Sequence, residues 1–217
     1  MPQVQSTNQL KIAVAKGRVA KQTLKALKNA GYKLPDDPGR SLRISDQDKT
    51  IDMLFVKSAD VPTYVELGVV DVGIVGKDVI DEKTYQIYEL MDLQIGKCDL
   101  CLAAYSDFDY NKIPYLKIAS KYPSQSYAFM KSKGIEGQVI PLEGSVELGP
   151  IVGLSDCIID IVETGRTLKD NNLEVIESIK PISSRLIANK IKYKTNTEPI
   201  IKFMDTLKAQ LITEVSA

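Results

Sequence analysis

The chain has 217 residues, 44% of them hydrophobic, with 28 basic and 28 acidic side chains and no histidine. This length and apolar fraction suit one large domain or two small ones and exclude disordered and collagen-like proteins. The balanced charge provides no overall positive charge for binding nucleic acid or an acidic membrane surface. Without histidine there is no Ser–His–Asp or Cys–His nucleophile and no histidine metal ligand, so any chemistry rests on carboxylates, Lys, Arg, Tyr, hydroxyls and backbone groups.

Apolar runs alternate with amphipathic segments along the chain, a pattern typical of an α/β protein with a largely parallel sheet. In the first half, strands are predicted at 10–15, 51–56 and 71–76. A helix follows the Gly17 turn, keeps helical apolar spacing and ends at Gly31. A shorter helix is predicted to start with Ser58 or Asp60 as its cap and to end at Gly68.

The second half continues the alternation with different elements. Strands are predicted at 99–105, 116–119, 138–141, 156–162 and 174–188, the last interrupted at Pro181. Helices are predicted at 124–133, from Ser145 as N-cap to Val152, just after Thr167, and from Thr197 to Val215. The length favours an α/β fold of two lobes around a cleft, with 1–98 plus 184–217 in the first lobe and 99–183 in the second.

Cysteines and targeting signals contribute little. Cys98 and Cys101 form a C-x-x-C on a predicted strand, where residues three apart point to opposite faces and cannot easily share a metal or a disulfide. Cys157 stands alone in another apolar run, so we expect buried, inert thiols. The Met1–Gln9 stretch lacks the apolar core of a signal peptide, and no segment is long and uncharged enough to span a bilayer, which favours a cytoplasmic protein.

The strand at 156–162 ends in a segment suited to binding phosphate. It is followed by Glu163-Thr164-Gly165-Arg166-Thr167 and then by a helix. Backbone N–H groups, two hydroxyls and a glycine at a strand end provide converging donors without a Cβ where the backbone must approach an anion. Glu163 and Asp160 can accept hydrogen bonds from sugar hydroxyls. The alternative is an ordinary strand-to-helix turn, with Thr as cap and Gly for a positive φ.

A longer pattern surrounds this loop. It consists of Glu147, Gly153, Ser155, Ile158, Asp160, Ile161 and Thr164-Gly165-Arg166-Thr167-Leu168, joined by Ala15–Arg18, Lys57–Pro62, Gly68–Asp78 and Leu142–Pro150. Together these residues resemble the ATP phosphoribosyltransferase family over nearly the whole chain, in order. The resemblance implies an architecture similar to type II periplasmic binding proteins. It also implies an enzyme that joins N1 of ATP to C1 of 5-phosphoribosyl 1-diphosphate, releasing diphosphate in the first step of histidine biosynthesis.

The resemblance also implies a subtype and partners. The family has a long form with an additional C-terminal regulatory domain and a short form without it, and this chain resembles the short form. Short-form chains work with a regulatory subunit similar to histidyl-tRNA synthetase in a hetero-octamer, so we expect such a partner, and neither nucleic acid nor membrane. Because both substrates are polyphosphates, we expect Mg²⁺ bound through substrate oxygens, and no residue is assigned to it.

Arginines are the first candidates for the leaving diphosphate, because their charge is permanent and their fork matches phosphate oxygens. Arg18, next to Lys16 and Gly17 at a strand end, is the first choice. Arg40 lies in a loop that could close over the cleft and is the second, the alternative for both being a solvated surface arginine. The remaining candidates differ: Arg43 is predicted at the surface and Arg185 in a structural role.

The resemblance assigns Thr164, Gly165, Arg166 and Thr167 to the 5-phosphate of the sugar. It favours a role for Glu147 near substrate or metal, although Glu147 also suits the first turn of its own helix. Three further candidates follow a first-lobe strand, where ligands of open α/β sheets gather: Lys57, Ser58 and Asp60.

Two other functions compete with this interpretation. A solute-binding protein of the periplasmic type would have two lobes and a phosphate-friendly cleft without chemistry, but the absent signal peptide and the Arg18 and Arg40 pair count against it. A nucleobase phosphoribosyltransferase would also end a strand with acids and a Thr-Gly-x-Thr loop. The Glu147 spacing and the N-terminal half resemble that class poorly.

Overall fold

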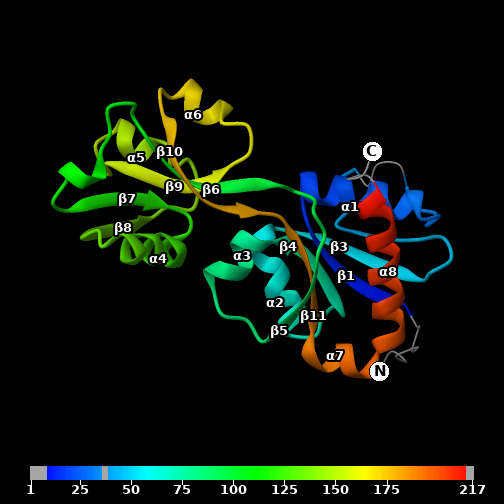
Figure 1. Ribbon diagram of the computed structural model, residues 1–217. Coiled ribbons are helices and arrows are strands. Elements are labelled where there is room, and N and C mark those ends of the chain that lie inside the picture. The colour runs from blue at the N-terminus through cyan, green and yellow to red at the C-terminus, as the bar shows by residue number, and fades with distance from the viewer. Residues whose placement is uncertain (1–8, 36–38, 214–217) are drawn as a thin grey trace. The chain divides into compact units, whose positions relative to one another are not determined.

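The computed structural model describes residues 9–35 and 39–213, and its elements are drawn in Figure 1. Apart from Gln9, the N-terminal stretch discussed above lies outside these residues. Within the described ranges, no helix is long and apolar enough to cross a membrane.

The chain divides into two compact units. Unit 1 comprises the chain up to Ile80, Tyr85–Gly96 and the part from Ser183 onward, and unit 2 comprises Asp81–Thr84 and Lys97–Ile182. The sequence predicts that the chain passes between the two lobes after residues 98 and 183. In the structure these crossings follow Gly96 and Ile182, and Asp81–Thr84 is an additional short excursion.

Unit 1 is built on a six-stranded sheet of order β2-β3-β1-β4-β11-β5. Its strands are β1 (Leu10–Ala15), β2 (Arg43–Ser45), β3 (Ile51–Val56), β4 (Val72–Gly76), β5 (Ile87–Asp92) and β11 (Ser184–Asn189). Its helices are α1 (Arg18–Asn29), the 3-10 turn η1 (Ser58–Asp60), α2 (Val61–Glu66), α7 (Lys190–Thr195) and α8 (Thr197–Thr213), while α3 (Lys77–Glu82) begins in unit 1 and ends in unit 2.

Unit 2 is built on a five-stranded sheet of order β10-β6-β9-β7-β8. Its strands are β6 (Cys98–Ala104), β7 (Leu116–Ser120), β8 (Gly137–Pro141), β9 (Cys157–Val162) and β10 (Glu174–Ile182). Its helical segments are η2 (Tyr110–Lys112), α4 (Pro123–Lys133), α5 (Leu148–Ile151) and α6 (Arg166–Asp170).

The expectation of a largely parallel sheet is wrong, because both sheets are mixed. In unit 1, β1 pairs in parallel with β3 and β4, whereas β2–β3, β4–β11 and β11–β5 are antiparallel. In unit 2, β7 pairs in parallel with β8 and β9, whereas β6–β9 and β6–β10 are antiparallel. The predicted 174–188 strand is two strands, β10 and β11, and the break falls at Ser183, so each half joins a different sheet.

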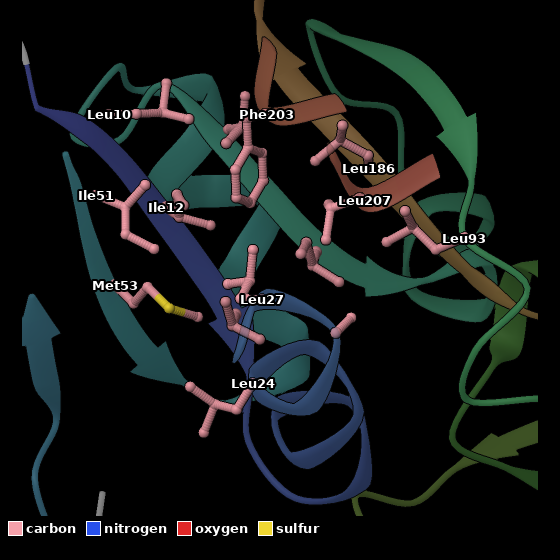
Figure 2. Packing of buried hydrophobic residues seen from close by; sticks show 14 of the residues in the cluster. Leu10, Ile12, Leu24, Leu27, Ile51, Met53, Leu93, Leu186, Phe203 and Leu207 are labelled. Carbon is pink, nitrogen blue, oxygen red and sulfur yellow. The ribbon is translucent and has the colours of Figure 1, made fainter. Parts of the chain in front are cut away.

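The core of unit 1 lies on both faces of its sheet. Figure 2 shows one face, where Phe203 of α8 points in among Ile12 of β1 and Leu186 of β11. Phe203 is only 1% exposed, and Leu27 of α1 packs in the same cluster. The other face is covered by α2, whose Val61 and Val65 are fully buried. Burial on both faces explains why these strands are near-continuous apolar runs.

Unit 2 has the same layering on a smaller scale. On one face α4 contributes Phe129 and Met130, and on the other Leu168 of α6 packs with Val146 and Ile158. The buried faces hold each strand end in a fixed place. The polar residues that follow those ends are therefore positioned by the core beneath them.

Candidate active site

The carboxyl ends of three parallel strands share one edge of the unit 1 sheet. Ala15 of β1 is paired with Val56 of β3, and the Lys16 amide donates to the Val56 carbonyl at 2.9 Å. The residues that follow, Lys16–Arg18 after β1 and Lys57–Asp60 after β3, therefore emerge side by side. β4 runs parallel to β1 and ends at the same edge, as expected for a ligand-binding edge of an α/β sheet.

A groove of about 600 Å³ lies at this edge, between α1 and the loop before β2. It is lined by Lys16 and Gly17 on one side and Arg40 on the other. The Arg40 loop reaches this edge because β2 runs antiparallel to β3 and the Phe55 amide donates to the Leu42 carbonyl at 2.9 Å. Two of the predicted diphosphate contacts, Lys16 and Arg40, thus share one groove of unit 1, whereas Arg18 does not line it.

Other first-lobe candidates sit at the same edge but outside the groove lining. Arg18, Lys57 and Asp60 are exposed, and Ser58 is half-buried. Asp60 occupies the predicted N-cap position of α2, but its side chain makes no capping hydrogen bond, and Ser58 lies inside η1, whose N-cap is Lys57. The Asp60 carboxylate is therefore not committed to its own helix.

Arg185 and Arg43 lie in different environments, as predicted. Arg185 is 17% exposed at its side chain and pairs with Glu89 at 2.8 Å and with Asp92, which makes it a structural residue of β11. Arg43 is 66% exposed at its side chain, so it does lie at the surface, and it pairs with the buried Asp52 at 2.8 Å.

The phosphate-loop candidate is a pocket of about 230 Å³ in unit 2. Its lining contains every second-lobe residue singled out from the sequence: Glu147, Asp160, Glu163, Thr164, Gly165, Arg166 and Thr167. β7 pairs in parallel with both β8 and β9, so the carboxyl ends of the three strands lie at one edge of the sheet. The pocket lies at that edge, where β9 ends. The structure therefore brings together residues separated by up to twenty positions in the sequence.

The backbone of the loop is shaped by Gly165. This glycine has φ 69° and ψ 6°, the left-handed region, and serves as the N-cap of α6 without a capping side chain. The Arg166 amide donates a long hydrogen bond, of 3.4 Å, to the Thr164 hydroxyl. First-turn amides of a helix have no acceptor within the helix, so these donors can meet an anion. Because α6 has five residues, the individual donors matter more than its dipole.

Acidic side chains complete the pocket. Asp160 is half-buried, and one of its oxygens accepts from the Ile161 amide at 2.8 Å. Glu147 precedes α5 and makes no capping hydrogen bond. The predicted cap at Ser145 is wrong, because Ser145 has φ 49° and its carbonyl closes a turn with the Leu148 amide. Glu147 lines the pocket, and its role near substrate or metal stays a prediction.

The three cysteines are all free thiols. Cys98 packs with the cluster on one face of its sheet and is only partly buried, so its predicted full burial is wrong. Cys101, three residues along the strand, is buried, and burial raises the pKa of its thiol and of the Cys157 thiol. Protonated thiols of this kind are poor nucleophiles and metal ligands.

Sequence reasoning missed the lysines of α1 that also line the unit 1 groove. Lys21, Lys25 and Lys28 lie on the same helix face as Gly17. Their i, i+4, i+7 spacing was visible in the sequence as soon as the helix was predicted. The prediction of that helix rested only on its apolar face.

Comparison with known proteins decides the family. The family model described as HisG: ATP phosphoribosyltransferase matches residues 57–209. The chain belongs to the ATP phosphoribosyltransferase family. Named members include one from Alkaliphilus metalliredigens, 46% identical over 202 residues, covering 92% of this chain and 97% of that protein. Another, from Listeria monocytogenes serotype 4b, is 46% identical over 210 residues, covering 96% and 98%.

Solved structures agree with the sequence relatives. An ATP phosphoribosyl transferase (HisG:HisZ) complex from Thermotoga maritima contains a chain with a TM-score of 0.80 and 35% identity, covering 95% of this chain and 99% of that one. The predicted fold class is therefore confirmed. Because almost the whole of each relative is covered, the relatives fall in the same length range as this chain, as predicted for the short form. Family membership argues against both rival interpretations.

Proposed function

We propose that the chain joins N1 of ATP to C1 of 5-phosphoribosyl 1-diphosphate, giving N1-(5-phosphoribosyl)-ATP and diphosphate, the first step of histidine biosynthesis. One observation carries this proposal: a chain of the ATP phosphoribosyltransferase family gathers Glu147, Asp160 and the whole Glu163–Thr167 loop into one pocket. The pocket combines amide and hydroxyl donors for a phosphate with carboxylate acceptors for ribose hydroxyls.

The reaction needs orientation and charge stabilisation more than a base. N1 of adenine carries a free lone pair, so nothing has to deprotonate the nucleophile before it attacks C1. As the C1–O bond breaks, negative charge grows on the departing diphosphate. Fixed cations that meet this charge lower the barrier because they stabilise the transition state more than the ground state. A chain without histidine can perform this chemistry.

We assign Lys16, Arg18 and Arg40 to the leaving diphosphate and the Thr164–Thr167 loop to the sugar 5-phosphate. Lys16 and Arg40 line the same groove, and Arg18 follows at the start of α1. The candidates after β3, Lys57, Ser58 and Asp60, are assigned to substrate contacts at that edge.

Magnesium and a regulatory subunit belong to the proposal. In the described part of the chain, no group of three Asp, Glu or Cys side chains is arranged to hold a metal ion. Mg²⁺ would arrive bound to substrate phosphates and neutralise charge on the diphosphate, and no residue is assigned to it. The related complex from Thermotoga maritima contains HisZ, which supports a regulatory partner similar to histidyl-tRNA synthetase. We extend the proposal to a hetero-octamer.

The test is product formation by the purified chain. The chain is mixed with ATP, 5-phosphoribosyl 1-diphosphate, Mg²⁺ and a diphosphatase, with and without a purified regulatory subunit. Near-ultraviolet absorbance follows the product, and mass spectrometry identifies it. N1-(5-phosphoribosyl)-ATP in either mixture supports the proposal. No product in both mixtures, with tight binding of a single ligand, would instead make the chain a binding protein.

A further inference from the structure

A buried serine lies at the strand edge that carries the unit 2 pocket. Ser120 is the last residue of β7, which lies between β8 and β9 in the sheet (Figure 1), and it is fully buried. Its pairing with β9 ends at Ile159, and the polar pocket residues of that strand begin at Asp160. Ser120 is therefore the last position at which β7 pairs with β9 before the polar end of that strand.

The Ser120 hydroxyl makes two hydrogen bonds that join separate elements. It donates to the Ile159 carbonyl of β9 at 2.6 Å and accepts from the Tyr122 amide, at the start of α4, at 2.9 Å. The Ser120 carbonyl accepts from the Leu142 amide, just after β8, at 3.0 Å. Since Ser120, Tyr122 and Ile159 are all buried, bulk water has no access with which to replace the hydroxyl when it is removed.

The bond to Ile159 orients the residue that follows it, Asp160. The Ile159 carbonyl and the Asp160 amide nitrogen and Cα belong to one planar peptide unit, so fixing the carbonyl fixes that plane. The Asp160 carboxylate lines the pocket and accepts from the Ile161 amide at 2.8 Å. On its other side this part of β9 pairs with β6, where Cys101 lies opposite Asp160. The Ser120 hydroxyl therefore supplies the hydrogen bond that holds this peptide on the β7 side.

We propose that Ser120 is a positioning residue for Asp160 and sets how well the pocket accepts the ribose hydroxyls of 5-phosphoribosyl 1-diphosphate. This inference rests on the proposed function and deepens it, because it concerns the same pocket. Without the hydroxyl, the Ile159 carbonyl loses this donor and its peptide plane can rotate. A small rotation of the plane displaces the carboxylate, which lies at the end of the side chain, by a larger distance. The phosphate loop begins only at Thr164, beyond the end of β9, so its donors stay in place.

The test compares Ser120→Ala with Ser126→Ala, in the presence of the regulatory subunit where turnover requires it. Ser126 is a matched control because it is also fully buried in unit 2, and its hydroxyl donates to the Tyr122 carbonyl at 2.8 Å. Each variant loses a buried hydrogen-bonded hydroxyl, so both should lower the Tm. Only Ser120→Ala should lower kcat/KM for 5-phosphoribosyl 1-diphosphate, by about fivefold, with the KM for ATP within about twofold of wild type.

A double-mutant cycle with Asp160→Asn tests whether Ser120 acts through Asp160. Asp160→Asn alone should lower kcat/KM for the sugar diphosphate, and adding Ser120→Ala should lower it no further. Ser120→Cys keeps the side-chain shape with a weaker donor, so its kcat/KM should lie between those of wild type and Ser120→Ala. The cysteine variant also carries the comparison if the alanine variant does not fold. Losses that multiply in the double variant, or an equal kinetic effect of Ser126→Ala, would overturn the inference.

A binding measurement separates this inference from the proposed function. Ribose 5-phosphate and inorganic phosphate are titrated against wild type and Ser120→Ala and followed by ligand-observed NMR, which needs no turnover. The variant should bind ribose 5-phosphate about fivefold more weakly and phosphate equally well. If wild type makes no phosphoribosyl-ATP but the variant shows this selective loss, the proposed function fails and the positioning role stands. If wild type makes product but the variant binds both ligands as wild type does, only the positioning role fails.

Discussion

Replacing Gly165 by alanine separates the backbone geometry of the phosphate loop from its chemistry. Gly165 has φ 69°, and a Cβ added there would meet only Val162 Cγ1, at 3.9 Å. The substitution therefore introduces no clash, only the strain of an L-residue in the left-handed region, about 1–2 kcal/mol. Alanine also reduces the freedom of the unfolded chain, which offsets about 0.4–1 kcal/mol. The net loss of stability should be about 1 kcal/mol.

Gly134→Ala is the matched control. Gly134 caps α4 with φ 67°, and nothing lies within 4 Å of an added Cβ. The same strain applies, so both variants should lower the Tm by a similar amount, about 2–4 °C for a chain of this size. The two glycines differ in what surrounds them. Strain at residue 165 can be relieved by rotating the amides of the phosphate loop, whereas strain at residue 134 falls at the end of α4, away from that loop.

The two variants should therefore differ in kinetics. Loss of one amide hydrogen bond to a phosphate costs about 1.5–3 kcal/mol, a rise of about tenfold or more in the KM for 5-phosphoribosyl 1-diphosphate. Gly134→Ala should leave that KM unchanged. Steady-state kinetics at saturating ATP and thermal denaturation of both variants provide the comparison. An unchanged KM in a destabilised Gly165→Ala variant would refute the assignment of the phosphate loop.

Three further changes test other parts of the molecule. Arg18→Ala should lower kcat far more than it raises the KM for the sugar diphosphate, because leaving-group charge grows in the transition state; unchanged turnover would remove Arg18 from the mechanism. Asn189→Ala should cost about 2–3 kcal/mol in urea denaturation, because this buried amide donates to two α2 carbonyls and accepts from two amides at the start of α7. Partial burial opposes ionisation of Asp92, but hydrogen bonds and the charge of Arg185 outweigh it and lower its pKa. Its stabilisation is therefore present above the ordinary carboxyl pKa of about 3.9 and fades below it, so Asp92→Asn should destabilise at pH 7 and much less near pH 3.

The sequence predicts most of the elements whose buried residues form a clear apolar pattern. β1 and β3 are largely buried and β9 is buried over its first three residues, and all three were predicted to within a residue; the helix from Thr197 follows its apolar stripe. The strand at Ile87–Asp92 was missed because Glu89 interrupts the apolar run, a charge that the structure explains by pairing with Arg185 and Lys77. No single-sequence pattern shows such a long-range partner.

Strand direction was the main error in the fold. A strand buried on both faces looks the same whether its neighbour runs parallel or antiparallel, so apolar runs alone suggested a parallel sheet. β10 and β11 are separated by Ser183 alone, where the chain leaves one unit for the other, and each strand pairs antiparallel in its own sheet. The Ser145 cap failed for a related reason. A serine that precedes a helix resembles a cap in sequence, but Ser145 has a φ of 49°, which is not the backbone conformation of an N-cap residue.

In both units, parallel strands carry the candidate chemistry and antiparallel strands carry the scaffold. The polar residues assigned to substrate follow β1 and β3 in unit 1, and β8 and β9 in unit 2, each within a parallel set. A parallel strand must turn into a crossover, so its carboxyl end presents free amides and short polar loops at one edge. The antiparallel strands β5, β10 and β11 instead hold ion pairs such as those of Arg185. Substitutions after parallel strands should therefore alter kinetics first, whereas substitutions within the antiparallel strands should alter stability first.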